Sequence, residues 1–260
     1  MNAALLSARG LCRRFGGLTA VADLDFDVRP GEILGVIGPN GAGKSTTFAM
    51  IAGALRPSAG RVLFDGFDIS GLPPHAVAAR GIMRTFQHNR PFAGMSLRDN
   101  VLVGMHTRLA GNVLGPMAGL PGSRRREDAA VRRADELLAF VGLGDERGTA
   151  VATLSFGQGR LLETARALAG EPKLLLFDEP AAGLTPAECG RLADVIRSVS
   201  GRGIAVLLIE HDMHFLLSLA ERVVVLNFGR KIADADPAAI RRDPAVIEAY
   251  LGEPVLRGGG

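Results

Sequence analysis

The sequence has few cysteines and no long apolar segment. Only two of its 260 residues are cysteine, Cys12 and Cys189, and their separation argues against a disulfide framework and for a cytosolic protein. The longest apolar runs, such as "AVLLI" and "VVVL", fall far short of the roughly 18–20 residues that cross a bilayer. The first residues lack a basic stretch followed by a long apolar one, so we expect no secretory signal.

The chain also lacks a strong charge imbalance. Its formal net charge is +3, and the arginines cluster in "GSRRRED" and "VRRAD" with no aromatic residues between them. This pattern favours a solvated helix face over a nucleic-acid site, so no nucleic-acid partner is expected. Glycine, by contrast, is abundant at 34 residues, nearly double the usual ~7%. That excess indicates many tight turns or close approaches of the backbone to a ligand.

Strand-like and helix-like segments alternate along most of the chain. "LTAVADLDFDVRPGE" has the alternation of a half-buried antiparallel strand, and "GRVLFDGFDI" predicts a hairpin turning at Asp65 and Gly66. "EILGVIG" is a continuous apolar run that suits a strand buried on both faces. After residue 155, the predicted strands "PKLLLFDEP", "GIAVLLIEHD" and "VVVLNFGRKI" alternate with helices. This order predicts an α/β fold with a parallel sheet covered on both faces.

The middle of the chain, from about residue 90 to 148, has a different residue pattern. A loop-rich stretch, "GNVLGPMAGLPGS", precedes a helix whose apolar positions lie on one face: Ala130, Ala134, Leu137, Leu138 and Val141. No buried-strand pattern occurs there. We therefore expect a helical insertion into the α/β core.

The segment "GPNGAGKST" fits the phosphate-binding pattern G-x-x-x-x-G-K-[ST] and lies between a buried strand and a helix (residues 45–55), which is the context the pattern needs. Its glycines let backbone N–H groups curl around a polyphosphate, and the helix N-terminus adds positive potential. Lys44 can reach the β- and γ-phosphates, and Ser45 can place a hydroxyl on Mg²⁺. The predicted nucleotide-binding residues are Gly38, Pro39, Asn40, Gly41, Ala42, Gly43, Lys44, Ser45 and Thr46.

Three polar residues follow two other buried strands. Asp178 and Glu179 end "LLLFDE", at the carboxyl end of a strand, where ligands bind in open α/β sheets. Asp178 can hold Mg²⁺, and Glu179 can polarise an attacking water. His211 follows "LLIE" and can reach a γ-phosphate, although a lone histidine at a strand end is more often structural.

Three further segments are ambiguous when taken alone. Gln87 lies where the α/β pattern gives way to the helical one, and it is either a polar surface residue or a hinge residue that contacts Mg²⁺ or water. Phe15, placed before the first clear strand, either covers the core or stacks on an adenine. Ser155 in "LSFGQGR" either caps a helix or belongs to a ligand site in which two glycines admit close backbone approach.

The succession of these elements resembles the nucleotide-binding subunit of an ABC transporter. It runs through an aromatic residue, "GPNGAGKST", a glutamine, "LSFGQ", "LLLFDEP", "AAGLT" and "EHD", and it spans residues 15 to 211. The resemblance implies a P-loop NTPase fold, with a RecA-like core, an antiparallel β portion and an inserted helical subdomain. It implies one ABC ATPase domain over residues 1–260, with the core and β portion at about 1–87 and 166–260 and the helical subdomain at about 88–165.

The resemblance also implies residue roles. Phe15 matches the adenine-stacking aromatic and residues 38–46 match the Walker A loop. Gln87 matches the glutamine that joins the nucleotide site to the helical subdomain and the membrane partner. The resemblance places it with the catalytic residues and, beside Ser45 and Asp178, with those that contact Mg²⁺. Asp178, Glu179 and His211 match the Walker B aspartate, the catalytic glutamate and the switch histidine, and Gly183 and Leu184 fall in a loop at the dimer interface. The signature, which touches the γ-phosphate of ATP held by an opposite subunit, matches Ser155, Phe156, Gly157 and Gln158.

The segments "RTFQHNRPFAGMSLRDNVLVGMH", "DEPAAGLTP" and "VIEAYLGE" further resemble ATPases of branched-chain or hydrophobic amino acid importers. Phe156 replaces a common glycine there, as an aromatic does in the "LSYGQ" form of that group, and Gly159 replaces a common glutamine. Implied partners are a second identical or related ATPase subunit, transmembrane permeases and, indirectly, a periplasmic binding protein. The implied location is the cytoplasmic face of the inner membrane. A urea or amide importer, a lipopolysaccharide exporter and a soluble non-transport ATPase are the alternatives.

Overall fold

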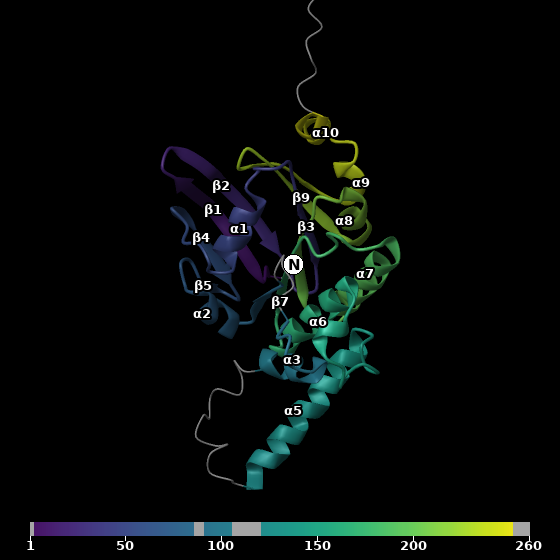
Figure 1. The fold of residues 1–260 in the computed structure, drawn as a ribbon. Helices are drawn as coiled ribbons and strands as arrows, with labels where there is room; N and C mark the ends of the chain where they lie inside the picture. The colour runs from purple at the N-terminus through teal and green to yellow at the C-terminus, as the bar shows by residue number, and fades with distance from the viewer. Residues whose placement is uncertain (1–2, 86–90, 106–120, 252–260) are drawn as a thin grey trace, which may run out of the picture. The chain divides into compact units, whose positions relative to one another are not determined.

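A computed structural model describes residues 3–85, 91–105 and 121–251 (Figure 1). Its contacts divide the chain into two compact units. The first consists of residues Met1–Pro74 and Ala205–Gly260, and the second of His75–Ile204. The sequence-based subdomain boundaries near residues 87 and 165 stay a prediction. Each unit is described by itself.

The first unit contains an antiparallel sheet of strand order β2-β1-β4-β5. Its strands are β1 (Leu6–Phe15), β2 (Leu18–Val28), β4 (Ala59–Phe64) and β5 (Phe67–Asp68). The predicted half-buried strand β2 and the predicted β4–β5 hairpin are confirmed. Asp65 and Gly66 turn that hairpin with φ of 50° and 79°, values that a two-residue turn of this type requires. Phe15 precedes β2, as predicted, but it is also the last residue of β1. The sequence did not suggest this strand, whose pairing with β2 is interrupted by register shifts.

The first unit also holds the strand that leads to the phosphate-loop motif. β3 (Ile33–Ile37) pairs in parallel with β8 (Ala205–Ile209) and with β9 (Arg222–Asn227). Every residue of β3 and β8 is buried, as their continuous apolar runs predicted. The remaining elements are β10 (Arg230–Ala235), α1 (Lys44–Ile51), α8 (Met213–Leu219), α9 (Pro237–Ile240) and α10 (Pro244–Leu251).

One predicted strand proves to be two. "VVVLNFGRKI" folds as β9 and β10, which pair antiparallel through a turn at Phe228 and Gly229. These two residues have φ of 45° and 77°, so the turn depends on a left-handed conformation that phenylalanine seldom adopts. The apolar composition of the segment hid the turn.

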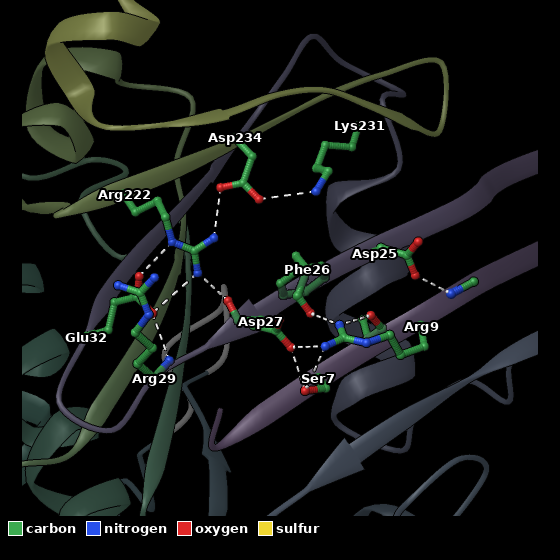
Figure 2. Close-up of polar contacts among 12 residues, drawn as sticks. Ser7, Arg9, Asp25, Phe26, Asp27, Arg29, Glu32, Arg222, Lys231 and Asp234 are labelled. Atoms are coloured by element: carbon green, nitrogen blue, oxygen red, sulfur yellow. Dashed lines mark hydrogen bonds and ion pairs between the residues drawn. The ribbon is translucent and has the colours of Figure 1, made fainter. Parts of the chain in front are cut away.

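An ion-pair network joins the strand ends of the first unit (Figure 2). The Arg222 guanidinium, at the start of β9, donates to Glu32 Oε1 at 2.8 Å, to Asp234 Oδ1 at 2.8 Å and to the carbonyl of Asp27. Glu32 is buried and also accepts a hydrogen bond of 2.7 Å from the Arg29 amide. The network therefore fixes the end of β2 and the start of β3 to the β9–β10 hairpin.

Over its described residues, the second unit is largely helical, and it also contains two strands. Its elements are α2 (Pro74–Ala79, beginning one residue before the boundary), β6 (Ile82–Arg84), α3 (Leu97–Gly104), α5 (Pro121–Phe140), a 3₁₀ turn (Val151–Thr153), α6 (Phe156–Ala169), β7 (Leu174–Asp178) and α7 (Pro186–Ser200). β6, which the sequence did not suggest, pairs in parallel with β7. α3, α5 and α6 pack together, and Ala134, Leu137, Leu138 and Val141 are buried, which confirms most of the predicted apolar face.

The described residues bear on three expectations from composition. Neither Cys12 nor Cys189 forms a disulfide. The arginines at positions 125, 126, 132 and 133 are exposed on α5, in keeping with a solvated helix face. Over residues 3–85, 91–105 and 121–251, no helix combines the length and the apolar character needed to cross a membrane.

Candidate functional site

The phosphate-loop motif forms the connection between β3 and α1 in the first unit. Three of its glycines have positive φ: Gly38 at 152°, Gly41 at 79° and Gly43 at 99°. A Cβ atom on Gly38 would lie 2.1 Å from the carbonyl oxygen of Leu226, and one on Gly43 would lie 2.5 Å from that of Ala20. At these two positions the sequence is therefore limited to glycine by both conformation and space.

The loop is closed upon itself by its lysine. Lys44 Nζ donates to the carbonyl oxygens of Gly38 at 2.6 Å and Pro39 at 2.9 Å. Ser45 is exposed one residue further along α1. Because Gly43, the N-cap residue of α1, offers no side-chain cap, the helix N-terminus keeps backbone N–H groups that can face an anion.

The β9–β10 turn and the β1–β2 hairpin flank this loop. The Gly229 amide donates to the Ala42 carbonyl at 3.1 Å, and the Ala22 amide donates to the Gly229 carbonyl at 2.9 Å. Phe15, at the end of β1, is 45% exposed and has the guanidinium carbon of Arg13 at 4.6 Å from its ring centroid. Arg13 thus forms a cation–π contact with the ring, which remains partly exposed to solvent.

His211 follows β8, as predicted. Its side chain is 61% exposed, and its Nδ1 lies 3.9 Å from the carboxylate of the fully buried Glu210. Asp212, the next residue, caps α8 by accepting from the amides of His214 and Phe215. The histidine is therefore held at a strand–helix junction with its ring accessible.

In the second unit, Asp178 is the last residue of β7 and is buried. Its Oδ2 accepts from Arg84 Nη2, at the end of β6, over 2.6 Å. Glu179 follows with φ of 49°, a left-handed conformation that is costly for this residue and tends to occur at functional sites. Sequence reasoning missed Arg84, which became recognisable only when β6 proved to lie beside β7.

Ser155 begins α6, and its predicted capping role is confirmed. Its Oγ accepts from the Gln158 amide at 3.2 Å, while Gln158 Oε1 accepts from the Ser155 amide at 2.9 Å, forming a reciprocal capping box. Gln158 Nε2 also donates to Glu146 Oε1 at 3.1 Å. The polar groups of Ser155 and Gln158 therefore order the helix start.

Two contacts join this helix start to the segment after β7, one to its loop and one to the first turn of α7. The ring of Phe156, half exposed, lies against Gly183, where a Cβ atom would come within 3.2 Å of it. Ser155 Oγ also donates to Glu188 Oε1, in the first turn of α7, at 3.2 Å. Glu188 was not predicted, and the sequence offers only the T-x-x-E capping pattern of residues 185–188 as a signal for it.

The predicted site residue Gln87 lies outside the described residues.

Comparison with protein families gives these motifs a name. The model described as "ABC transporter" matches residues 21–182. The chain belongs to the ABC transporter ATP-binding family. A second model, described as "Branched-chain amino acid ATP-binding cassette transporter", matches residues 230–255. The family predicted from the motif succession is thereby confirmed.

Individual relatives of this ABC cassette cover almost its whole length. The high-affinity branched-chain amino acid transport ATP-binding protein BraF of Pseudomonas aeruginosa is 42% identical, over 97% of this chain and 100% of BraF. LivG of Escherichia coli K12, described in the same words, is 39% identical with the same coverage. The lipopolysaccharide export system ATP-binding protein LptB of Haemophilus influenzae is 34% identical, over 96% of this chain and 98% of LptB.

The fold has a close counterpart among solved structures. The ADP conformation of MJ1267, an ATP-binding cassette of an ABC transporter, superposes with a TM-score of 0.83 at 30% identity, covering 97% of this chain and 100% of MJ1267. The P-loop NTPase fold class inferred from the sequence is thus confirmed.

Proposed function

We propose that this chain is the ATP-hydrolysing subunit of an importer for branched-chain or other hydrophobic amino acids. The observation that carries the proposal is the near-full-length similarity to BraF and LivG, at 42% and 39% identity, together with the match of residues 230–255 to the branched-chain model. The Walker A geometry described above supports ATP as the substrate, because its glycines and helix N-terminus suit a polyphosphate.

The proposed roles follow the predicted ones. Residues 38–46 bind the phosphates, with Lys44 exchanging its contacts to loop carbonyls for phosphate oxygens, and Phe15 stacks on the adenine. Glu179 orients and deprotonates the attacking water, and His211 donates to the γ-phosphate. Gln87 reports the state of the nucleotide to the permease.

The donor set fits Mg²⁺. Asp178 and Ser45 offer hard oxygen donors, and Mg²⁺ in nucleotide sites is held by one or two side chains plus phosphates and water. When bound, Mg²⁺ would neutralise charge on the β- and γ-phosphates, with Ser45, Asp178 and Gln87 as the residues that hold it. Arg84 keeps the Asp178 carboxylate in one orientation.

The signature residues are proposed to act on ATP bound to a second ATPase subunit. Ser155 and Gly157 would contact its γ-phosphate, so that ATP holds the closed dimer and hydrolysis releases it. The cassette would work at the cytoplasmic face of the membrane against permease subunits, supplied by a periplasmic binding protein.

The enzymatic part of the proposal is tested by Glu179→Gln. We expect ATP binding, measured by calorimetry, to persist while steady-state phosphate release falls by about 10³-fold. Near-normal turnover would reject the role of Glu179. The dimer is tested by Ser155→Arg in the Glu179→Gln background: monomer ATP binding should persist, and ATP-driven dimerisation, followed by light scattering, should disappear.

A lipopolysaccharide exporter is the second candidate, because LptB is 34% identical over nearly the whole chain. Co-purification of the tagged protein from its native membrane separates the two. Recovery of two permeases and a second ATPase supports the importer, whereas recovery of lipopolysaccharide-export components would overturn it.

A further inference from the structure

Glu188 lies across the start of the signature helix, although it belongs to α7. Its Oε1 accepts from Ser155 Oγ at 3.2 Å, and its carboxylate also accepts from the Gly157 amide. Ser155 and Gly157 are the groups proposed above to bind the γ-phosphate of the partner's ATP. A carboxylate of the same chain therefore already occupies a hydroxyl and an amide that an anion would use.

Glycine at position 157 makes this approach possible. A Cβ atom on residue 157 would lie 2.4 Å from Glu188 Oε1 and within 2.7 Å of the Cδ and Cγ atoms of the same side chain. Any larger residue would push the carboxylate away from the helix start. Gly157, which is proposed above to contact a nucleotide, thus also admits an internal acidic group.

The charge of α6 explains why the position attracts a carboxylate. The first turn of α6 contains no acidic residue of its own, although helix N-termini favour negative charge. Glu188 supplies that charge from a neighbouring helix. A γ-phosphate is also an anion, so it and Glu188 would compete for the same donors, and their like charges would repel each other at this range.

The second oxygen of Glu188 anchors it to the loop that precedes α7. Oε2 accepts from the Thr185 amide at 3.0 Å and from the Thr185 hydroxyl at 2.9 Å. These bonds, and then those from Ser155 and Gly157, lower the pKa of the Glu188 carboxyl below its ordinary value. Glu188 can therefore release the signature and keep its cap on α7.

We propose that Glu188 is an internal stand-in for the γ-phosphate, which holds the signature residues in the free subunit and is displaced when the partner's ATP arrives. This inference rests on the proposed action of the signature on a partner's ATP. Glu188 would then set how much ATP the dimer requires without affecting ATP binding to the monomer.

The test measures ATP-driven dimerisation by light scattering, with Glu179→Gln as the parent. Glu188→Gln removes the charge and keeps the cap, because glutamine serves equally at the third position of a capping box. We expect the ATP concentration for half-maximal dimerisation to fall by about fivefold or more. Glu188→Ala, checked for folding by circular dichroism, should lower it as well, and the ATP affinity of the monomer should stay unchanged.

Glu146→Gln is the matched control. Glu146 is also a carboxylate at this helix start, but its side chain accepts from Gln158 Nε2 at 3.1 Å and, among the described residues, forms no hydrogen bond with Ser155 or Gly157. An equal shift in this control would show a general charge effect and overturn the proposal, as would unchanged or weaker dimerisation in both Glu188 variants. If the parent fails to dimerise with ATP, or still dimerises with Ser155→Arg, the proposed function of the signature fails instead.

Discussion

Replacing Arg222 with methionine should destabilise the first unit strongly. The change keeps an unbranched side chain and removes the donors to Glu32, Asp234 and the Asp27 carbonyl (Figure 2). The Glu32 side chain is only 5% exposed, so its charge would lose its ion-pair partner without gaining much water. Burial opposes the charge of Arg222, but the hydrogen bonds that it donates to Glu32 and Asp234 outweigh this effect and raise the pKa of the guanidinium.

The expected magnitude follows from this burial. Breaking a buried pair by removing one partner costs about 3–5 kcal/mol. Arg222 is 19% exposed, and Glu32 would still accept from the Arg29 amide. Both facts reduce the penalty, so we expect a loss of about 3 kcal/mol in the free energy of unfolding.

Arg9→Met is the comparison that makes the measurement decisive. Arg9 and Asp27 approach to 2.6 Å, closer than Arg222 and Glu32, but their side chains are 49% and 40% exposed. A surface pair of this kind contributes about 0.5 kcal/mol. Both variants would be compared with the wild-type chain by urea denaturation.

A loss below about 1 kcal/mol for Arg222→Met, or a loss no larger than that of Arg9→Met, would refute the reasoning from burial. Repeating Arg222→Met in a Glu32→Gln background adds a second check. With the buried charge already neutral, the cost of Arg222→Met should shrink by about half or more.

Three further predictions concern the motifs. Gly43→Ala should abolish ATP binding measured by calorimetry, because the added Cβ atom would lie 2.5 Å from the Ala20 carbonyl oxygen. Gly41→Ala, whose Cβ atom would meet open space, should still bind ATP, with a loss of about 1–2 kcal/mol in binding free energy because of the positive φ. Arg84→Met should lower the melting temperature, since Asp178 is buried, and Asp178→Asn in the same background should restore most of the loss. The pKa of Glu188 is lowered in the folded chain, so its carboxylate stabilises the fold fully above its ordinary pKa of 4.5. This contribution disappears as the pH falls through the lower pKa of the folded state. The difference in melting temperature between wild type and Glu188→Gln should therefore shrink on acidification below pH 4.5.

The buried strands and the phosphate loop could be read from the sequence because their signals are local. β3 and β8 are unbroken apolar runs, and the pattern G-x-x-x-x-G-K-[ST] is defined by eight consecutive residues, 38–45. The β9–β10 turn escaped because phenylalanine in a left-handed conformation does not look like a turn residue. β6 escaped because three residues are too few to show a period.

The contacts of the candidate site could not be predicted, because they join residues that are far apart in the sequence. Ser155 could be assigned to a helix start from four residues, but its partner Glu188 is 33 positions away and enters only through the packing of α6 against α7. Arg84 and Asp178 are likewise 94 positions apart. A single sequence contains no pattern that pairs such residues, so motif reasoning named the residues proposed to face a ligand and missed the residues that contact and position them.

Within the second unit, side-chain contacts join the start of the signature helix α6 to the loop of residues 181–185. Phe156 packs on Gly183, and Glu188 bonds both to Ser155 and to Thr185, which caps α7. A displacement of Glu188 by a phosphate would therefore alter the surroundings of the loop as well as those of the signature. Substitutions at Gly183 and at Ser155 should consequently be non-additive in ATP-driven dimerisation, since residues that share a contact network couple energetically. Additive effects would mean that the two segments respond to the partner independently, despite their contacts in the free subunit.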